Sequence, residues 1–184
     1  METRDSTWKI VKETFPSEVI SIVGDILAGI ILSLLILPFE SFILLILIIP
    51  ALLSLRGNLS GPYIARTSRD LIIGEFNKKS VIQNILATIS LSAVTAIIIG
   101  FFAFFLDNFF IKLNLIPPFI LIMIPIISIF MTLSFSLPIS TLINSLIFKS
   151  GLDPNNVVNP IMTAIDDFLT VICFYFTIIM LGVP

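Results

Sequence analysis

The side chains available for chemistry in this sequence are carboxylates, amides and hydroxyls. The 184 residues include no histidine and a single cysteine, Cys173. Without histidine the chain lacks the commonest general base and the usual zinc, copper and iron ligand, and one cysteine excludes a disulfide within the chain. The ligands that remain are oxygens, which suit hard cations such as Mg²⁺. Sodium and protons remain open alternatives at this point.

The richest set of polar residues lies near the C-terminus. Asn156, Pro160, Thr163, Asp167 and Thr170 follow one another at spacings of 4, 3, 4 and 3. At about 100° per residue, these spacings place the five residues on one face of a helix. Polar groups inside a bilayer are costly and are therefore candidates for function.

The depth of Asp167 in this helix follows from its predicted start. Asp153-Pro154 is typical of an N-cap followed by proline at the first helical position. Asp167 comes 14 residues after Asp153, or about 21 Å along a helix rising 1.5 Å per residue, which is well inside a hydrocarbon core of about 30 Å. Asp166 lies about 100° further round and need not face the same way, but it too is a candidate cation ligand. The alternative is a carboxylate that hydrogen-bonds to neighbouring hydroxyls in a packed bundle.

A second candidate segment runs from Pro50 to Pro62. Gly57, Gly61 and Pro62 fall within six residues, and Pro62 removes the helical donor for the carbonyl of Asn58. This composition predicts an interrupted helix, which is tolerated at membrane depth only where it lines a cavity or is buried in protein. The alternative is a simple helix end at the membrane surface.

Three further residues are candidate cation ligands from their position alone, namely Asp25, Asn159 and Thr163. Asp25 could bind an ion or direct its carboxylate to the membrane surface. The hydroxyl faces of the third and fourth apolar segments are interpreted differently, as contacts between helices, where small residues let backbones approach.

The composition indicates a membrane protein. Hydrophobic residues make up 57% of the chain and charged residues 12%, with a mean hydropathy of +1.13, whereas soluble domains carry about 25% charged residues. The net charge of −2 argues against a nucleic-acid partner. No cleavable signal sequence is expected, since the first 15 residues contain acidic groups and no small-residue cleavage site.

Runs without charge predict five membrane-spanning helices. We therefore expect an all-α polytopic membrane protein in contact with lipid, with a cytoplasmic or interfacial segment at residues 1–16 and a five-helix transport domain at residues 17–184. The N-terminal segment is expected to form a short helix on the membrane surface or a frayed terminus. The predicted spans are Glu18–Leu37, a second from about Ser41 that is interrupted near Gly57–Gly61, Ser80–Leu106, Pro117–Phe148 and Asp153–Leu181.

The basic residues predict the orientation of the bundle. If five spans alternate, nine of the ten Lys and Arg residues fall on one side and only Lys112 on the other. The positive-inside rule then places the N-terminus in the cytoplasm. We expect a multi-pass protein of the cell membrane.

An enzymatic function is not expected. Gly24-Asp25, Ile165-Asp166 and Pro50-Ala51-Leu52 resemble fragments of the intramembrane aspartyl protease motifs, in which two carboxylates share a proton. The fragments occur in the wrong order, however, and five spans are too few. Serine and metal-dependent hydrolysis would need a histidine.

Two segments together resemble the MgtE-type magnesium transporters and their eukaryotic relatives, solute carrier family 41. The first is Pro50-Ala51-Leu52-Leu53-Ser54-Leu55-Arg56-Gly57-Asn58, a proline-led apolar run that ends in Gly-Asn. The second is Leu152-Asp153-Pro154, followed by Pro160 and by Asp167-Phe168-Leu169-Thr170. The basic residue before Gly57 is closer to the eukaryotic branch, and the second motif selects Asp167 over Asp166.

The resemblance implies a homodimeric channel or transporter for Mg²⁺ or another divalent cation, with the ion path between subunits and lined by the second and fifth helices. Asp167 would bind the ion, and Asn58 would lie near the pore. About 16 residues precede the first predicted span, so the cytoplasmic sensor domains of bacterial members are not expected. Two alternatives remain open, a cation-coupled Na⁺/Mg²⁺ exchanger and a membrane scaffold subunit that transports nothing.

Overall fold

A computed structural model describes residues 6–184, and within this range the chain folds into five long helices. All five are long and apolar enough to cross a membrane, which confirms the prediction of an all-α polytopic membrane protein. A short π-helical turn, η1 (Asp107–Ile111), follows the third helix. The helices are α1 (Thr7–Ile36), α2 (Phe42–Ile72), α3 (Lys78–Leu106), α4 (Pro118–Lys149) and α5 (Pro154–Met180).

The predicted interruption of the second helix is wrong. α2 is helical without a break from Phe42 to Ile72, through both Pro50 and Pro62. Each proline removes one helical hydrogen bond, but the rest of the helix keeps its own and buries one side against neighbouring helices. The alternative of a helix end near Gly57 is wrong for the same reason.

The first helix also begins earlier than its predicted span. α1 starts at Thr7, where the Ser6 side chain caps the helix by accepting a hydrogen bond from the Lys9 N–H, and it continues through Pro16. The segment before Glu18 is therefore an extension of α1 and not a separate surface helix. The predicted surface segment also included residues 1–5, which lie outside the described residues.

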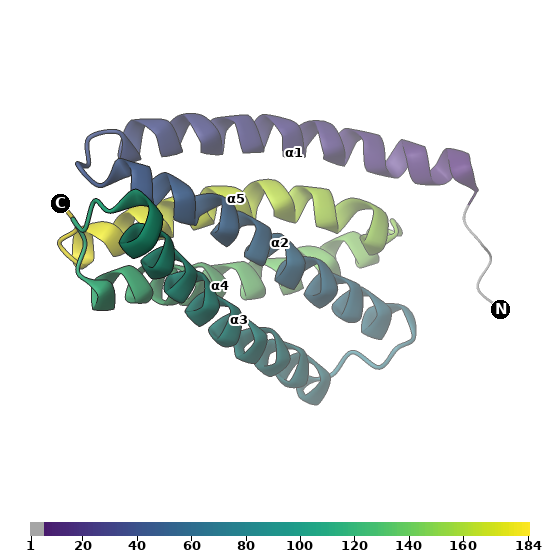
Figure 1. The fold of residues 1–184 in the computed structure, drawn as a ribbon. Helices are drawn as coiled ribbons and strands as arrows, with labels where there is room; N and C mark the ends of the chain where they lie inside the picture. The colour runs from purple at the N-terminus through teal and green to yellow at the C-terminus, as the bar shows by residue number, and fades with distance from the viewer. Residues whose placement is uncertain (1–5) are drawn as a thin grey trace.

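The bundle is built around α2, α4 and α5. α4 packs against α2, α3 and α5, while α1 packs chiefly against α5 and lies on the outside of the bundle (Figure 1). Small residues line the contact of α1 with α5: Ser17, Ser21 and Ala28 are buried, and a Cβ added at Gly24 would meet the Ala164 Cβ at 2.4 Å. The close packing of these two helices places side chains of α1 directly against the polar face of α5.

The predicted hydroxyl faces of the third and fourth helices are contacts between helices. Thr88 and Ser92 of α3 and Ser136, Ser140 and Asn144 of α4 are all buried. Most of these hydroxyls make hydrogen bonds within the protein. Thr88 and Ser92, for example, donate to the backbone carbonyl four residues earlier. The small polar residues let the helices approach closely.

The start of α1 and the C-terminus lie at opposite ends of the bundle (Figure 1). The beginning of α1, the α2–α3 connection and the α4–α5 connection share one end, as five alternating spans require. Arg56 does not belong to the basic residues at that end, because it lies in the middle of α2 and is 4% exposed. The remaining imbalance, eight basic residues against Lys112 alone, still favours a cytoplasmic N-terminus.

Candidate cation site

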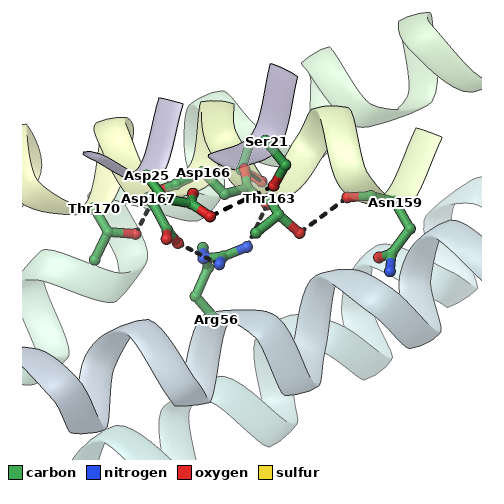
Figure 2. Close-up of polar contacts among 9 residues, drawn as sticks. Ser21, Asp25, Arg56, Asn159, Thr163, Asp166, Asp167 and Thr170 are labelled. Atoms are coloured by element: carbon green, nitrogen blue, oxygen red, sulfur yellow. Dashed lines mark hydrogen bonds and ion pairs between the residues drawn. The ribbon is translucent and has the colours of Figure 1, made fainter. Parts of the chain in front are cut away.

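Arg56 is the centre of a charged cluster inside the bundle. Its guanidinium extends from α2 towards α5 (Figure 2), where Nη1 lies 3.3 Å from Asp166 Oδ2 and Nη2 contacts Asp167 Oδ1. We call Asp25, Arg56, Asp166 and Asp167 the Asp–Arg cluster. The N-cap at Asp153, which accepts a hydrogen bond from the Asn155 N–H at 2.9 Å, starts α5 where the sequence predicts and so sets the depth of both carboxylates.

The two neighbouring aspartates of α5 have different surroundings. Asp166 is fully buried, and it accepts a hydrogen bond from the Ser136 hydroxyl of α4 as well as from Arg56. The Asp167 side chain is 17% exposed, and Arg56 is its only ion-pair partner within residues 6–184. Asp166 is thus fixed in the core, whereas Asp167 is the accessible carboxylate of the pair.

Asp25 supplies the third carboxylate, from α1. Its side chain lies beside that of Asp167 (Figure 2), close enough for the two acids to interact electrostatically. The Ser21 hydroxyl donates to Asp25 Oδ2 at 3.5 Å, while Asp25 Oδ1 is buried without a hydrogen-bond partner among the described residues. Of the two predicted roles for Asp25, the structure favours an inward-facing carboxylate over one directed to the membrane surface.

The remaining predicted ligands lie outside the cluster. Thr163 and Asn159 precede Asp167 by one and two turns of α5 and are partly exposed and exposed, respectively, with the Thr163 hydroxyl donating to the Asn159 backbone carbonyl (Figure 2). The Asn159 side chain lies over Gly61 of α2, where its Oδ1 would be 3.7 Å from an added Cβ. Asn58 is exposed on α2 and does not join the cluster.

Arg56 is the residue whose role the sequence reasoning missed. The predicted interruption of the second helix placed it in a basic connection at the membrane surface. Its partners are 110 and 111 residues away in the sequence, so no local pattern identifies them. The signal that could have identified it is its position inside an apolar run that also contains a candidate ion site. An arginine at membrane depth needs a carboxylate partner.

The charges of the cluster do not balance within one chain. Three carboxylates and one guanidinium sum to −3 + 1 = −2, if all four groups are ionised. Buried charge of this kind is costly unless it is paired. Within residues 6–184 no three acidic or cysteine side chains lie close enough to hold a metal ion directly.

Comparison with known proteins identifies the family. The model of the MgtE family, described as a divalent cation transporter, matches residues 49–177. The matched region contains Arg56, Asn58, Asp166 and Asp167, and it begins after α1 and Asp25. No curated protein and no solved structure matches the chain. Because the match covers more than two thirds of the sequence, the chain belongs to the MgtE family of divalent cation transporters, as a multi-pass membrane protein.

Proposed function

We propose that this protein conducts Mg²⁺ across the membrane and that the ion binds at the Asp–Arg cluster. The main support for the proposal is that the side chains of Asp25 and Asp167, from two different helices, lie side by side in the middle of a membrane-spanning bundle. Carboxylates at this depth mark ion pathways. Family membership supports transport of a divalent cation, and an enzymatic role finds no support in a transporter family.

Binding of a hydrated ion is the form of recognition that these residues favour. Mg²⁺ gives up its water reluctantly and is usually held by one or two carboxylates. Asp167 is partly exposed, and Asp25 Oδ1 has no partner among the described residues, so both can accept hydrogen bonds from a hydrated ion. Thr163 and Asn159 extend the same side of α5 by two turns and would supply further oxygens along the path.

A second copy of the chain would complete this path. The outer surface of α2 exposes Ser54, Gly57 and Asn58, and Asn159 of α5 lies over the adjacent Gly61. Polar and small residues are poor lipid-facing groups but are typical of contacts between membrane helices. A symmetric homodimer with α2 and α5 of each copy at its axis would cover these residues and bring two Asp167 carboxylates to one ion.

Flux into liposomes tests the proposal. Purified protein is reconstituted into vesicles that contain a Mg²⁺-sensitive dye, and uptake is followed after external Mg²⁺ is added. We expect saturable uptake that Asp167→Asn reduces at least about tenfold, because removing a buried ionic contact costs more than 1.4 kcal/mol. Asp153→Asn is the matched control, since asparagine also caps helices. Unchanged uptake in Asp167→Asn would contradict the proposal and favour a scaffold role.

The same vesicles distinguish a channel from a coupled exchanger. A channel transports Mg²⁺ down its own gradient whether or not a sodium gradient is present. A strict requirement for an opposing sodium gradient would instead assign the chain to Na⁺/Mg²⁺ exchange.

A further inference from the structure

The contact between Arg56 and Asp167 bears on how the site selects its ion. The guanidinium touches both neighbouring aspartates of α5 at once, through Nη1 on Asp166 and Nη2 on Asp167. It is therefore a monovalent cation, fixed to the chain, that occupies the carboxylate at which the transported ion is proposed to bind. An ion that reaches Asp167 must compete with it.

The two ends of this contact are not equally exchangeable. Asp166 is 0% exposed and has a second donor in Ser136, so its contact with Arg56 is enclosed by protein. Asp167 is 17% exposed and has Arg56 as its only cationic partner within the described part of the chain. The fork of the guanidinium allows one N–H group to leave Asp167 while the other remains on Asp166.

We propose that Arg56 is an internal competitor for the transported cation at Asp167, held in place by Asp166 as a positioning residue. When a divalent cation binds, Nη2 leaves Asp167 and Nη1 stays on Asp166; when the ion departs, Nη2 returns. The competition weakens binding, which conduction requires because an ion must leave as readily as it enters. This inference rests on the proposed function.

The competition also favours divalent over monovalent ions. The attraction of an ion to Asp167 and Asp25 scales with its charge. At the same distance a divalent ion is attracted about twice as strongly as Na⁺, so it displaces the guanidinium from Asp167 more readily than Na⁺ does. Arg56 is in this sense a specificity-determining residue that discriminates against monovalent cations.

Two variants with opposite expected effects test this role. In Asp166→Asn, Arg56 loses its anchoring charge and pairs with Asp167 alone, so Mg²⁺ should bind about tenfold more weakly. In Arg56→Gln/Asp166→Asn, the competitor is removed together with the fully buried carboxylate that it would otherwise leave unpaired. Mg²⁺ should then bind about tenfold more tightly, Mg²⁺ flux at saturation should fall, and added Na⁺ should compete for the site.

The measurement is Mg²⁺ titration calorimetry on the full chain in detergent, together with the concentration dependence of Mg²⁺ flux in vesicles. Arg56→Lys is a further variant that keeps the charge, and because an ammonium lacks the rigid planar fork that holds both carboxylates at once, Mg²⁺ should bind to it more tightly than to the wild type. A purely structural ion pair would lower the melting temperature in all three variants without shifting the Mg²⁺ affinity in opposite directions.

The outcomes separate this inference from the proposed function. If Asp167→Asn abolishes Mg²⁺ binding while the Arg56 and Asp166 variants keep the wild-type affinity, the competitor role is wrong and the ion site remains. If Asp167→Asn binds Mg²⁺ like the wild type, the site itself is wrong and the inference fails with it. Opposite shifts in Asp166→Asn and Arg56→Gln/Asp166→Asn would support the competitor role.

Discussion

Asp166 shows how a charged residue is accommodated at the centre of an apolar bundle. Its carboxylate is fully buried, and it accepts hydrogen bonds from Ser136 on α4 and Arg56 on α2. Breaking a buried ion pair by removing one partner typically costs about 3–5 kcal/mol, because the other charge is left without compensation. Asp166 therefore ties three helices together, whereas Asp167 exchanges Arg56 for an ion in our proposal.

The hydroxyl of Ser136 gives a prediction about stability. Ser136→Ala should lower the free energy of unfolding by about 1–3 kcal/mol, because it leaves a buried carboxylate with one donor fewer. Ser134→Ala is the control on the same helix, since Ser134 is exposed and its hydroxyl bonds only to backbone carbonyls. Thermal unfolding in detergent measures both, and equal melting temperatures in the two variants would argue against the contact.

The sequence predicts the carboxylates of the site better than it predicts their partner. Asp167 is identified in two ways, because it lies on the polar face predicted for the last helix and also matches the family motif. The roles of Arg56 and Ser136 depend on contacts between residues that are 30 to 111 positions apart, and such contacts leave no periodic signal in one sequence. A charged residue between an apolar run and two glycines also resembles the start of a surface connection, so the sequence alone predicts Arg56 at the membrane surface.

At the scale of whole helices, the close packing of α1 on α5 positions Asp25. The predicted ends of the last three helices agree closely with the structure, because charges, N-caps and prolines mark them in the sequence. The continuity of α2 could not be predicted in the same way. Proline and glycine lower the local preference for helix, but burial against three neighbouring helices outweighs it.

The close approach at Gly24 gives a prediction for α1. Gly24→Ala should destabilise the protein by about 1–3 kcal/mol, since its Cβ would come within 2.4 Å of the Ala164 Cβ. It should also weaken Mg²⁺ binding, because α1 carries Asp25. Gly29→Ala is the matched control on the same helix, with nothing within 4 Å of an added Cβ.

A second substitution checks that the effect comes from this contact. Ala164→Gly should restore both stability and Mg²⁺ affinity to Gly24→Ala, because it removes the opposing methyl group. Equal effects of Gly24→Ala and Gly29→Ala would show instead that α1 is not held by this contact.

At the scale of the whole molecule, the single chain is an incomplete ion pathway in our proposal. Asn58 is exposed on α2, although the family resemblance assigns it to the pore region. A second copy facing this surface would reconcile the two observations. It would also double the number of accessible carboxylates at the site, so that a hydrated divalent cation lies between two Asp167 side chains.

Chemical crosslinking tests this arrangement. In a background where the buried Cys173 is replaced by alanine, Asn58→Cys should form a covalent dimer with a short bifunctional thiol reagent in vesicles. Ile98→Cys is the control, because Ile98 is 51% exposed on α3, outside the proposed interface. Dimers formed equally by both variants, or by Ile98→Cys alone, would contradict the proposed interface.

The most direct test of the central claim is to locate the ion. Mn²⁺ substitutes for Mg²⁺ and scatters anomalously, so crystals of the full chain grown with Mn²⁺ would show where the cation binds. We expect an anomalous peak about 4 Å from the Asp167 carboxylate oxygens, the separation that one intervening water produces, and we expect no such peak in Asp167→Asn. A peak that persists in Asp167→Asn, or one that lies away from Asp25 and Asp167, would contradict the assignment of the cation site.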